Sequence, residues 1–169
     1  MRGLVSHTQS EAGLAGAWKD LLTAVFDGAI QVWYSSDLDE GGGVRAGLDW
    51  REQLNARIAE SQAILAIQTP ESSGRPWIMW ECGRASGVKE ERQLIPIAYG
   101  MGKDDVVSPL SSYQACSGEQ RREVGRVCEA LADLAAFLLE DPDAPPVFGA
   151  ERVLFNGRDF TGWGFHPPG

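Results

Sequence analysis

Ala63-Ile64-Leu65-Ala66-Ile67 is an unbroken apolar run near the middle of the chain. Thr69-Pro70 ends the run, and the polar stretch Ser72-Ser73-Gly74 follows it. An apolar run without polar alternation is typical of a strand that is buried on both faces of a parallel sheet. The run therefore predicts a central strand with other elements packed on both of its sides.

Three further segments have the composition of strands. Leu4-Val5-Ser6 is a short apolar run, and residues 30–34 are mostly β-prone. Leu94-Ile95-Pro96-Ile97 predicts another strand. Because Pro96 has no N–H to donate to a ladder, we expect that strand near an edge of the sheet.

Apolar residues at helical spacing separate these strands. We expect helices over about residues 10–26, from Asp49 onward, from near Trp77 onward and over about residues 118–139. In the second of these helices, the apolar residues that we expect on one buried face are Trp50, Leu54 and Ile58.

The starts of these helices have residue types that favour capping. Thr8 and Glu11 have the spacing of a capping box, as do Ser117 and Gln120. Asp49 is a suitable N-cap for the second helix. Strands that alternate with helices in this way specify an α/β fold with a doubly wound, mostly parallel sheet.

We expect this fold to occupy residues 1–140. Residues 141–169 contain five of the nine prolines. We interpret them as a C-terminal extension or as the start of a further domain.

Composition and charge argue against several classes of protein. The chain has 15 basic and 24 acidic residues, a net charge of -9, so its surface as a whole repels nucleic acid and anionic membranes. No stretch approaches the roughly 20 apolar residues of a membrane span. Three cysteines without a CxxC pair and only two histidines argue against a disulfide framework and a zinc site. We therefore expect a cytoplasmic protein that binds no metal and makes no direct contact with nucleic acid or membrane.

Ligands of open α/β sheets bind beyond the carboxyl ends of the strands. We expect four segments to converge there: Ser6-His7, residues 34–43, residues 68–74 and the start of the helix near Trp77. The chain has no GxGxxG after its first strand and no GxxxxGK[ST]. A Rossmann dehydrogenase and a P-loop NTPase are therefore poor hypotheses.

The helix near Trp77 carries the most informative pattern. Trp77, Glu81 and Arg84 recur at i, i+4 and i+7 and share one helical face. An aromatic ring beside a carboxylate can stack on a planar group and desolvate the carboxylate, which raises its pKa. Two structural alternatives stay open: Trp77 packs in the core, and Glu81 opposes the helix macrodipole. This helix alone favours the structural interpretation.

Taken in order along the chain, these segments resemble the TIR (Toll/interleukin-1 receptor) domain family, especially its bacterial members. The resemblance covers residues 2 to 100, with a looser likeness up to residue 139. The segments that carry it are Leu4-Val5-Ser6-His7, Val32-Trp33-Tyr34-Ser35-Ser36-Asp37 followed by glycines and Leu48-Asp49-Trp50, Ile58 to Ser61 with Ala63 to Pro70, the WxxxE pair Trp77 and Glu81, and Leu94 to Ile97 as an "IPI" strand.

The resemblance implies a flavodoxin-like sheet flanked by helices, and it implies an activity. Many bacterial TIR domains cleave the bond between nicotinamide and ribose in NAD, with the WxxxE glutamate as the catalytic residue. Glu81 would then be catalytic, Trp77 would lie beside the nicotinamide, and Ser6 with His7 would lie on the adenosine side. The weaker candidates for the substrate pocket are Trp33, Tyr34, Asp37 and Arg45.

The implied reaction needs NAD+ as substrate and neither a metal nor another cofactor. Glycosidic cleavage develops oxocarbenium character on the ribose, which a nearby carboxylate stabilises. Capture of the ADP-ribosyl cation by water gives ADP-ribose, whereas capture by its own adenine gives a cyclic product.

The resemblance also implies partners. TIR domains of this kind often act in antiphage defence or toxin-like signalling and need neighbouring TIR domains for activity. The loop from Asp37 to Asp49, with its three consecutive glycines, fits a self-association loop. A sensor domain or a partner protein would control that assembly.

Two other functions stay open at this point. Many animal TIR domains are non-enzymatic adaptors that bind other TIR domains, although an adaptor has no chemical need for Trp77 and Glu81. A nucleoside deoxyribosyltransferase has a related sheet and a carboxylate nucleophile.

Overall fold

The computed structural model describes residues 1–38, 43–44, 47, 49–75 and 93–138. Within them, five parallel strands form one sheet in the order β2-β1-β3-β4-β5. This is the flavodoxin-like order of a doubly wound sheet, and it confirms the predicted α/β class. The strands are β1 (Arg2–Ser6), β2 (Gln31–Trp33), β3 (Ala63–Gln68), β4 (Gln93–Ala98) and β5 (Cys116–Ser117).

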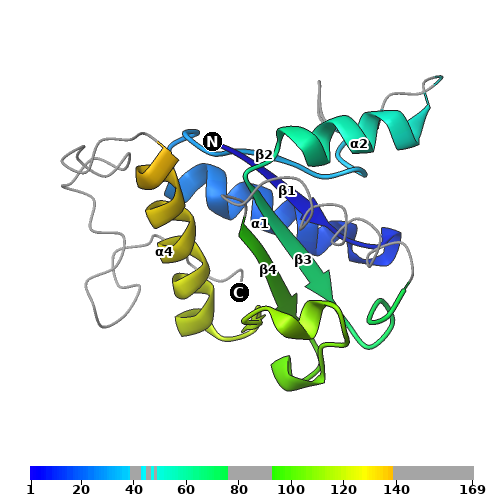
Figure 1. Ribbon diagram of the computed structural model, residues 1–169, viewed down its shortest axis with the longest axis vertical. Coiled ribbons are helices and arrows are strands. Elements are labelled where there is room, and N and C mark those ends of the chain that lie inside the picture. The colour runs from blue at the N-terminus through cyan, green and yellow to red at the C-terminus, as the bar shows by residue number, and fades with distance from the viewer. Residues whose placement is uncertain (39–42, 45–46, 48, 76–92, 139–169) are drawn as a thin grey trace, which may run out of the picture.

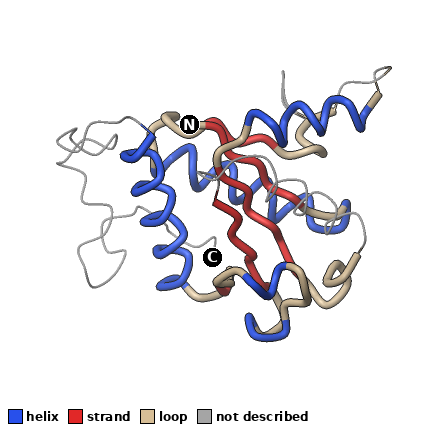
Figure 2. Tube along the Cα trace, in the orientation of Figure 1, coloured by secondary structure: helices blue, strands red, loops and turns tan. Residues whose placement is uncertain are grey.

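Helices pack on both faces of this sheet (Figure 1, Figure 2). One hydrophobic core lies between the sheet and the helices α1 and α4, and a second lies between the sheet and α2. The described helices are α1 (Ala12–Val25), α2 (Trp50–Glu60) and α4 (Arg121–Leu138), with short 3-10 turns at Gln9–Glu11, Lys103–Asp105 and Leu110–Ser112.

The central strand β3 supplies both cores. All six of its residues are buried. Leu65 and Ile67 join the core under α1 and α4, whereas Ile64 and Ala66 join the core under α2. Successive strand residues point to opposite faces, so an unbroken apolar run is what a strand between two cores requires.

Pro96 lies on β4, which is next to the edge of the sheet. Gln93 and Tyr99 donate their N–H groups toward β3. The backbone N–H groups of a strand point alternately to its two sides. Residue 96 is three positions from each of these residues, so its backbone faces the β5 side. The two-residue β5 pairs with β4 only from Ile97 onward. The missing N–H of Pro96 therefore costs no bond to β3, and the prediction of a strand near the edge is confirmed.

The predicted cap Asp49 starts α2, whereas the predicted cap Thr8 starts a short 3-10 turn and α1 itself begins at Ala12. The Glu11 carboxylate accepts the backbone N–H of Thr8 at 2.8 Å in the 3-10 turn that leads into α1. The Asp49 carboxylate accepts the N–H of Arg51 at 2.8 Å at the start of α2. Both contacts satisfy N–H groups that have no partner within a helix.

The predicted start of α4 is wrong by three residues. α4 begins at Arg121 rather than at residue 118, and Gln120 is the residue whose carbonyl accepts the first helical N–H groups. Ser117 belongs to β5, and its N–H donates to the Glu123 carboxylate at 2.7 Å. Ser117 and Gln120 therefore do not form the predicted capping box, because Ser117 pairs with β4 as part of β5 and lies before the start of α4.

The predicted buried face of α2 is correct for two of its three residues. Leu54 and Ile58 are 3% and 1% exposed, whereas Trp50 is 43% exposed. Trp50 is the first residue of α2 and lies outside the core that Leu54 and Ile58 join. The Arg51 guanidinium lies 5.6 Å from its ring centre instead.

No helix in the described part of the chain combines the length and apolarity needed to cross a membrane. Residues 139–169 lie outside the described residues. The division into residues 1–140 and 141–169 therefore stays a prediction.

We expect Leu54→Ala to lower the free energy of unfolding by about 2–5 kcal/mol, because it empties a buried site under α2. Trp50→Ala should cost less than about 1 kcal/mol, because its side chain is 43% exposed and lies outside the core. Urea unfolding at 25 °C measures both. Equal losses would contradict the packing of α2 described above.

Candidate functional site

The strand order reverses between β1 and β3. The chain leaves β1 for β2 on one side and later enters β3 on the other side of β1. Ligands of such sheets bind in the crevice beyond the carboxyl ends of the two strands at the reversal. These strands end at Ser6 and Gln68. We therefore place the candidate site beyond these two residues.

Glu11 is a buried carboxylate that ties together the two loops at this edge. Its Oε2 accepts the N–H of Thr8, after β1, at 2.8 Å. Its Oε1 accepts the hydroxyl of Thr69, after β3, at 2.7 Å. The N–H of Thr69 in turn donates to the Ser72 hydroxyl oxygen at 2.9 Å. One side chain, only 4% exposed, thus joins the ends of both central strands.

The environment of Glu11 favours its ionised form. Burial by itself raises the pKa of this carboxyl, but hydrogen bonds from Ser72, Thr8 and Thr69 outweigh burial and hold the pKa below its ordinary value. An ionised carboxylate only accepts hydrogen bonds. Glu11 therefore positions the edge and is not suited to supply a proton.

His7 links the end of β1 to the loop after β2. Its Nε2 lies 2.6 Å from Ser36 Oγ, and its Nδ1 lies 3.2 Å from the Val5 carbonyl oxygen. Because a carbonyl only accepts, we assign the proton to Nδ1, so that Nε2 accepts from the Ser36 hydroxyl. The ring of Tyr34 packs edge-on against the imidazole, with ring centres 5.6 Å apart.

Burial lowers the pKa of His7 below 6.5, and the Val5 carbonyl and the Glu11 charge offset this effect only in part. The imidazole is therefore neutral at pH 7. It brings hydrogen-bonding capacity to the edge without bringing a positive charge.

Asp37 anchors the start of the loop after β2. Its carboxylate pairs with Lys19 of α1 at 2.9 Å, and its side chain is 4% exposed. A buried pair of this kind is held in place because separating its charges leaves one of them uncompensated. The structure therefore gives this predicted pocket residue a positioning role.

The remaining described candidates lie on the two different faces of the sheet. Tyr34 packs with His7 and against the core under α1 and α4. Trp33 belongs to the core under α2. Ser6 is 2% exposed and lies two strand positions after Leu4, which also faces α2. The structure thus brings the His7 and Tyr34 side chains together, whereas the Trp33 side chain and, by alternation, that of Ser6 belong to the α2 face.

Trp77, Glu81 and Arg45 lie outside the described residues, so their roles stay predictions. Within the described ranges, no group of three or more His, Cys, Asp or Glu side chains is arranged to hold a metal ion.

Two polar atoms after β3 are buried without a hydrogen-bond partner among the described residues: Gln68 Oε1 and Ser73 Oγ. The Gln68 amide nitrogen donates to the Ile67 carbonyl at 2.9 Å, and this bond leaves Oε1 as the open acceptor. A buried acceptor without a donor costs roughly 1–3 kcal/mol. A bound group that donates to Gln68 Oε1 would recover that cost.

Sequence patterns did not single out Ser36, Thr69 or Ser72 as partners in this site. Each is a small polar residue in a loop, and loops have no hydrophobic period that would indicate a direction. The Thr8–Glu11 spacing was recognisable, but only as a helix start. The contact between Glu11 and Thr69 joins residues 58 positions apart.

No protein-family model matches the chain, and no curated protein matches it. A functional assignment therefore rests on the geometry of this edge and on the motifs that resemble TIR domains.

We expect Glu11→Gln to lower the free energy of unfolding by about 1–3 kcal/mol at pH 7, because it weakens charge-assisted hydrogen bonds at both loops. The folded pKa of Glu11 is lower than its ordinary value of 4.5. The contribution of its ionised form is therefore present above that pH and is lost as the pH falls through the folded pKa. Urea unfolding at pH 7 and at lower pH measures this loss.

Glu71→Gln is the matched control, since Glu71 is an exposed residue of the loop after β3. It should change the stability by less than about 0.5 kcal/mol. A Glu11→Gln loss that stays constant as the pH falls below 4.5 would show that charge is not its cause.

Proposed function

We propose that this chain is a TIR domain that cleaves NAD+ between nicotinamide and ribose, with Glu81 as the catalytic carboxylate. Three features support the TIR assignment. The strand order is flavodoxin-like, Ser6-His7 lies at the end of the first strand, and Thr69-Pro70 follows the third. The two sequence motifs occur in the same order as in the resemblance to TIR domains.

The observation that carries the proposal is that polar groups gather at the carboxyl edge of the sheet, on both of its faces. His7, Tyr34 and Ser36 meet beyond β1 and β2, and Gln68 Oε1, at the end of β3, is a buried acceptor without a partner among the described residues. The stretch with Trp77 and Glu81 follows β3 in the sequence. It therefore belongs to the connection that leaves from this same edge.

The chemistry suits an edge of this kind. His7, which the resemblance puts on the adenosine side, is neutral and therefore adds no positive charge to the site of a cationic substrate. Loss of nicotinamide leaves positive charge on the ribose, which the Glu81 carboxylate stabilises. Water then gives ADP-ribose, or the adenine of the same molecule gives a cyclic product.

Self-association through the loop of residues 37–49 is part of the proposal. Both ends of this loop are held: Asp37 pairs with Lys19, and Asp49 caps α2. Leu38 lies beside the first anchor and is 98% exposed. A leucine held in solvent at an anchored loop offers an apolar contact to a second domain.

We place this activity in the cytoplasm. Cys116 and Cys128 are both free and buried in the described core, as expected of a chain from a reducing compartment. A sensor domain or partner protein, in a role in defence or immune-type signalling, would supply the trigger for assembly.

A non-enzymatic adaptor is the second candidate, and the exposed Leu38 favours it equally. An adaptor needs the contact surface but not the carboxylate. Catalysis by Glu81 therefore separates the two functions.

Glu81→Gln should lower the rate of nicotinamide release from NAD+ by about 100-fold or more, because a neutral amide does not stabilise the oxocarbenium-like transition state. The measurement is NAD+ consumption by concentrated protein, with products resolved by mass spectrometry. Glu71→Gln should retain the wild-type rate.

Turnover that survives Glu81→Gln would contradict the site assignment. A wild-type protein that stays inactive even when clustered on a surface would favour the adaptor. Cleavage of deoxynucleosides in place of NAD+ would favour a nucleoside deoxyribosyltransferase.

The rate per protomer should rise with protein concentration, and Leu38→Ser should abolish that rise by removing the apolar contact. Phe137→Ser is the control, since Phe137 is a 63% exposed aromatic residue on α4. Both variants should keep wild-type stability within about 0.5 kcal/mol. Equal effects of the two variants, or a rate that does not depend on concentration, would argue against assembly through this loop.

A further inference from the structure

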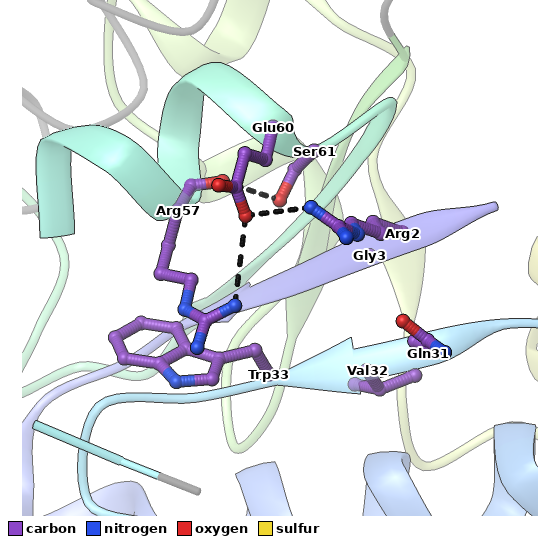
Figure 3. A pocket seen from close by; sticks show the side chains of 8 residues that line it. All are labelled: Arg2, Gly3, Gln31, Val32, Trp33, Arg57, Glu60 and Ser61. Atoms are coloured by element: carbon purple, nitrogen blue, oxygen red, sulfur yellow. Dashed lines mark hydrogen bonds and ion pairs between the residues drawn. The ribbon is translucent and has the colours of Figure 1, made fainter. Parts of the chain in front are cut away.

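A cavity of about 190 Å³ lies on the α2 face of the sheet (Figure 3). Its walls come from the start of β1, from β2 and from the last turn of α2. Arg2 and Gln31, the first residues of β1 and β2, line it. It therefore lies toward the amino ends of the strands, away from the carboxyl edge where the candidate site lies.

Two arginines in this cavity share one carboxylate. Arg2 Nη1 lies 2.8 Å from Glu60 Oε2, and Arg57 Nη1 lies 3.5 Å from the same oxygen (Figure 3). The charges of the two guanidinium groups and the one carboxylate sum to +1. The chain as a whole has a net charge of -9, so this cavity opposes the sign of the protein.

Packing holds the arginine pair in place. The Arg57 guanidinium lies 5.7 Å from the ring centre of Trp33, which is itself 9% exposed and therefore a fixed platform. Glu60 holds Arg2 from the other side. Each guanidinium has five N–H donors, and sharing one carboxylate oxygen leaves donors on both groups for a ligand.

We propose that this cavity binds a phosphoryl group, as inorganic phosphate or as a small phosphomonoester. The planar donors of arginine match phosphate oxygens in pairs. Gln31 lies across the cavity from Arg57 and can add an amide N–H (Figure 3). The volume is below the roughly 300–1,000 Å³ of pockets for drug-sized ligands. The cavity therefore takes a single small anion rather than a dinucleotide, and this inference is independent of the proposed function.

Isothermal titration calorimetry on the full chain tests the proposal at low ionic strength, with inorganic phosphate, ribose 5-phosphate and acetate as separate probes. Saturable binding of phosphate or of ribose 5-phosphate is the expected result, with acetate much weaker. Arg57→Gln and Arg2→Gln should each weaken binding at least about tenfold, because each removes charged donors. Glu60→Gln should tighten binding, because it removes the competing negative charge.

Arg122→Gln is the matched control, since Arg122 is an exposed arginine on α4. Thermal unfolding checks each variant, and Arg2, whose side chain is 52% exposed, serves if Arg57→Gln does not fold. If both phosphate probes bind, the cavity recognises the phosphoryl group by itself. If only ribose 5-phosphate binds, the cavity requires the phosphomonoester. The proposal is overturned by the absence of saturable binding, by acetate that binds equally well, or by an equal loss in Arg122→Gln.

Discussion

The burial of β3 on both of its faces is the constraint on which the rest of the structure depends. All six of its residues are buried, so each face needs its own layer of helices. α1 and α4 cover one face and α2 covers the other. With β2 on one side of β1 and β3 on the other, the strand order reverses at β1. The candidate site lies at that reversal.

The loops at this edge are held by polar contacts rather than by apolar packing. Glu11 joins the loops after β1 and β3, and Asp37 fixes the start of the loop after β2 through Lys19. Ionised side chains with partners of this kind define positions sharply, because leaving any of them unpaired in the interior is costly. Leu38, directly after Asp37, is exposed beside this edge.

Charge is distributed differently at the two ends of the strands. At the carboxyl edge, burial keeps His7 neutral, and the ionised Glu11 is enclosed by donors. Toward the amino ends, Arg2 and Arg57 form a basic cavity on a chain of net charge -9. The first environment gains no positive charge from His7, whereas the second is basic.

The sequence by itself determined the α/β class and four of the five described strands, but it did not indicate the two-residue β5. The hydrophobic patterns, the unbroken run at residues 63–67 and Pro96 are features of short stretches of sequence. They indicated these strands, their alternation with helices and the strand near the edge. The pairing of Glu11 with Thr69 was decided only in the tertiary structure, as was the placement of Trp33 under α2, away from the group around His7. A period tells which residues are buried, but not which distant segment buries them. Side-chain contacts across the sheet depend on the order and register of the strands, and these arise only when the whole chain packs.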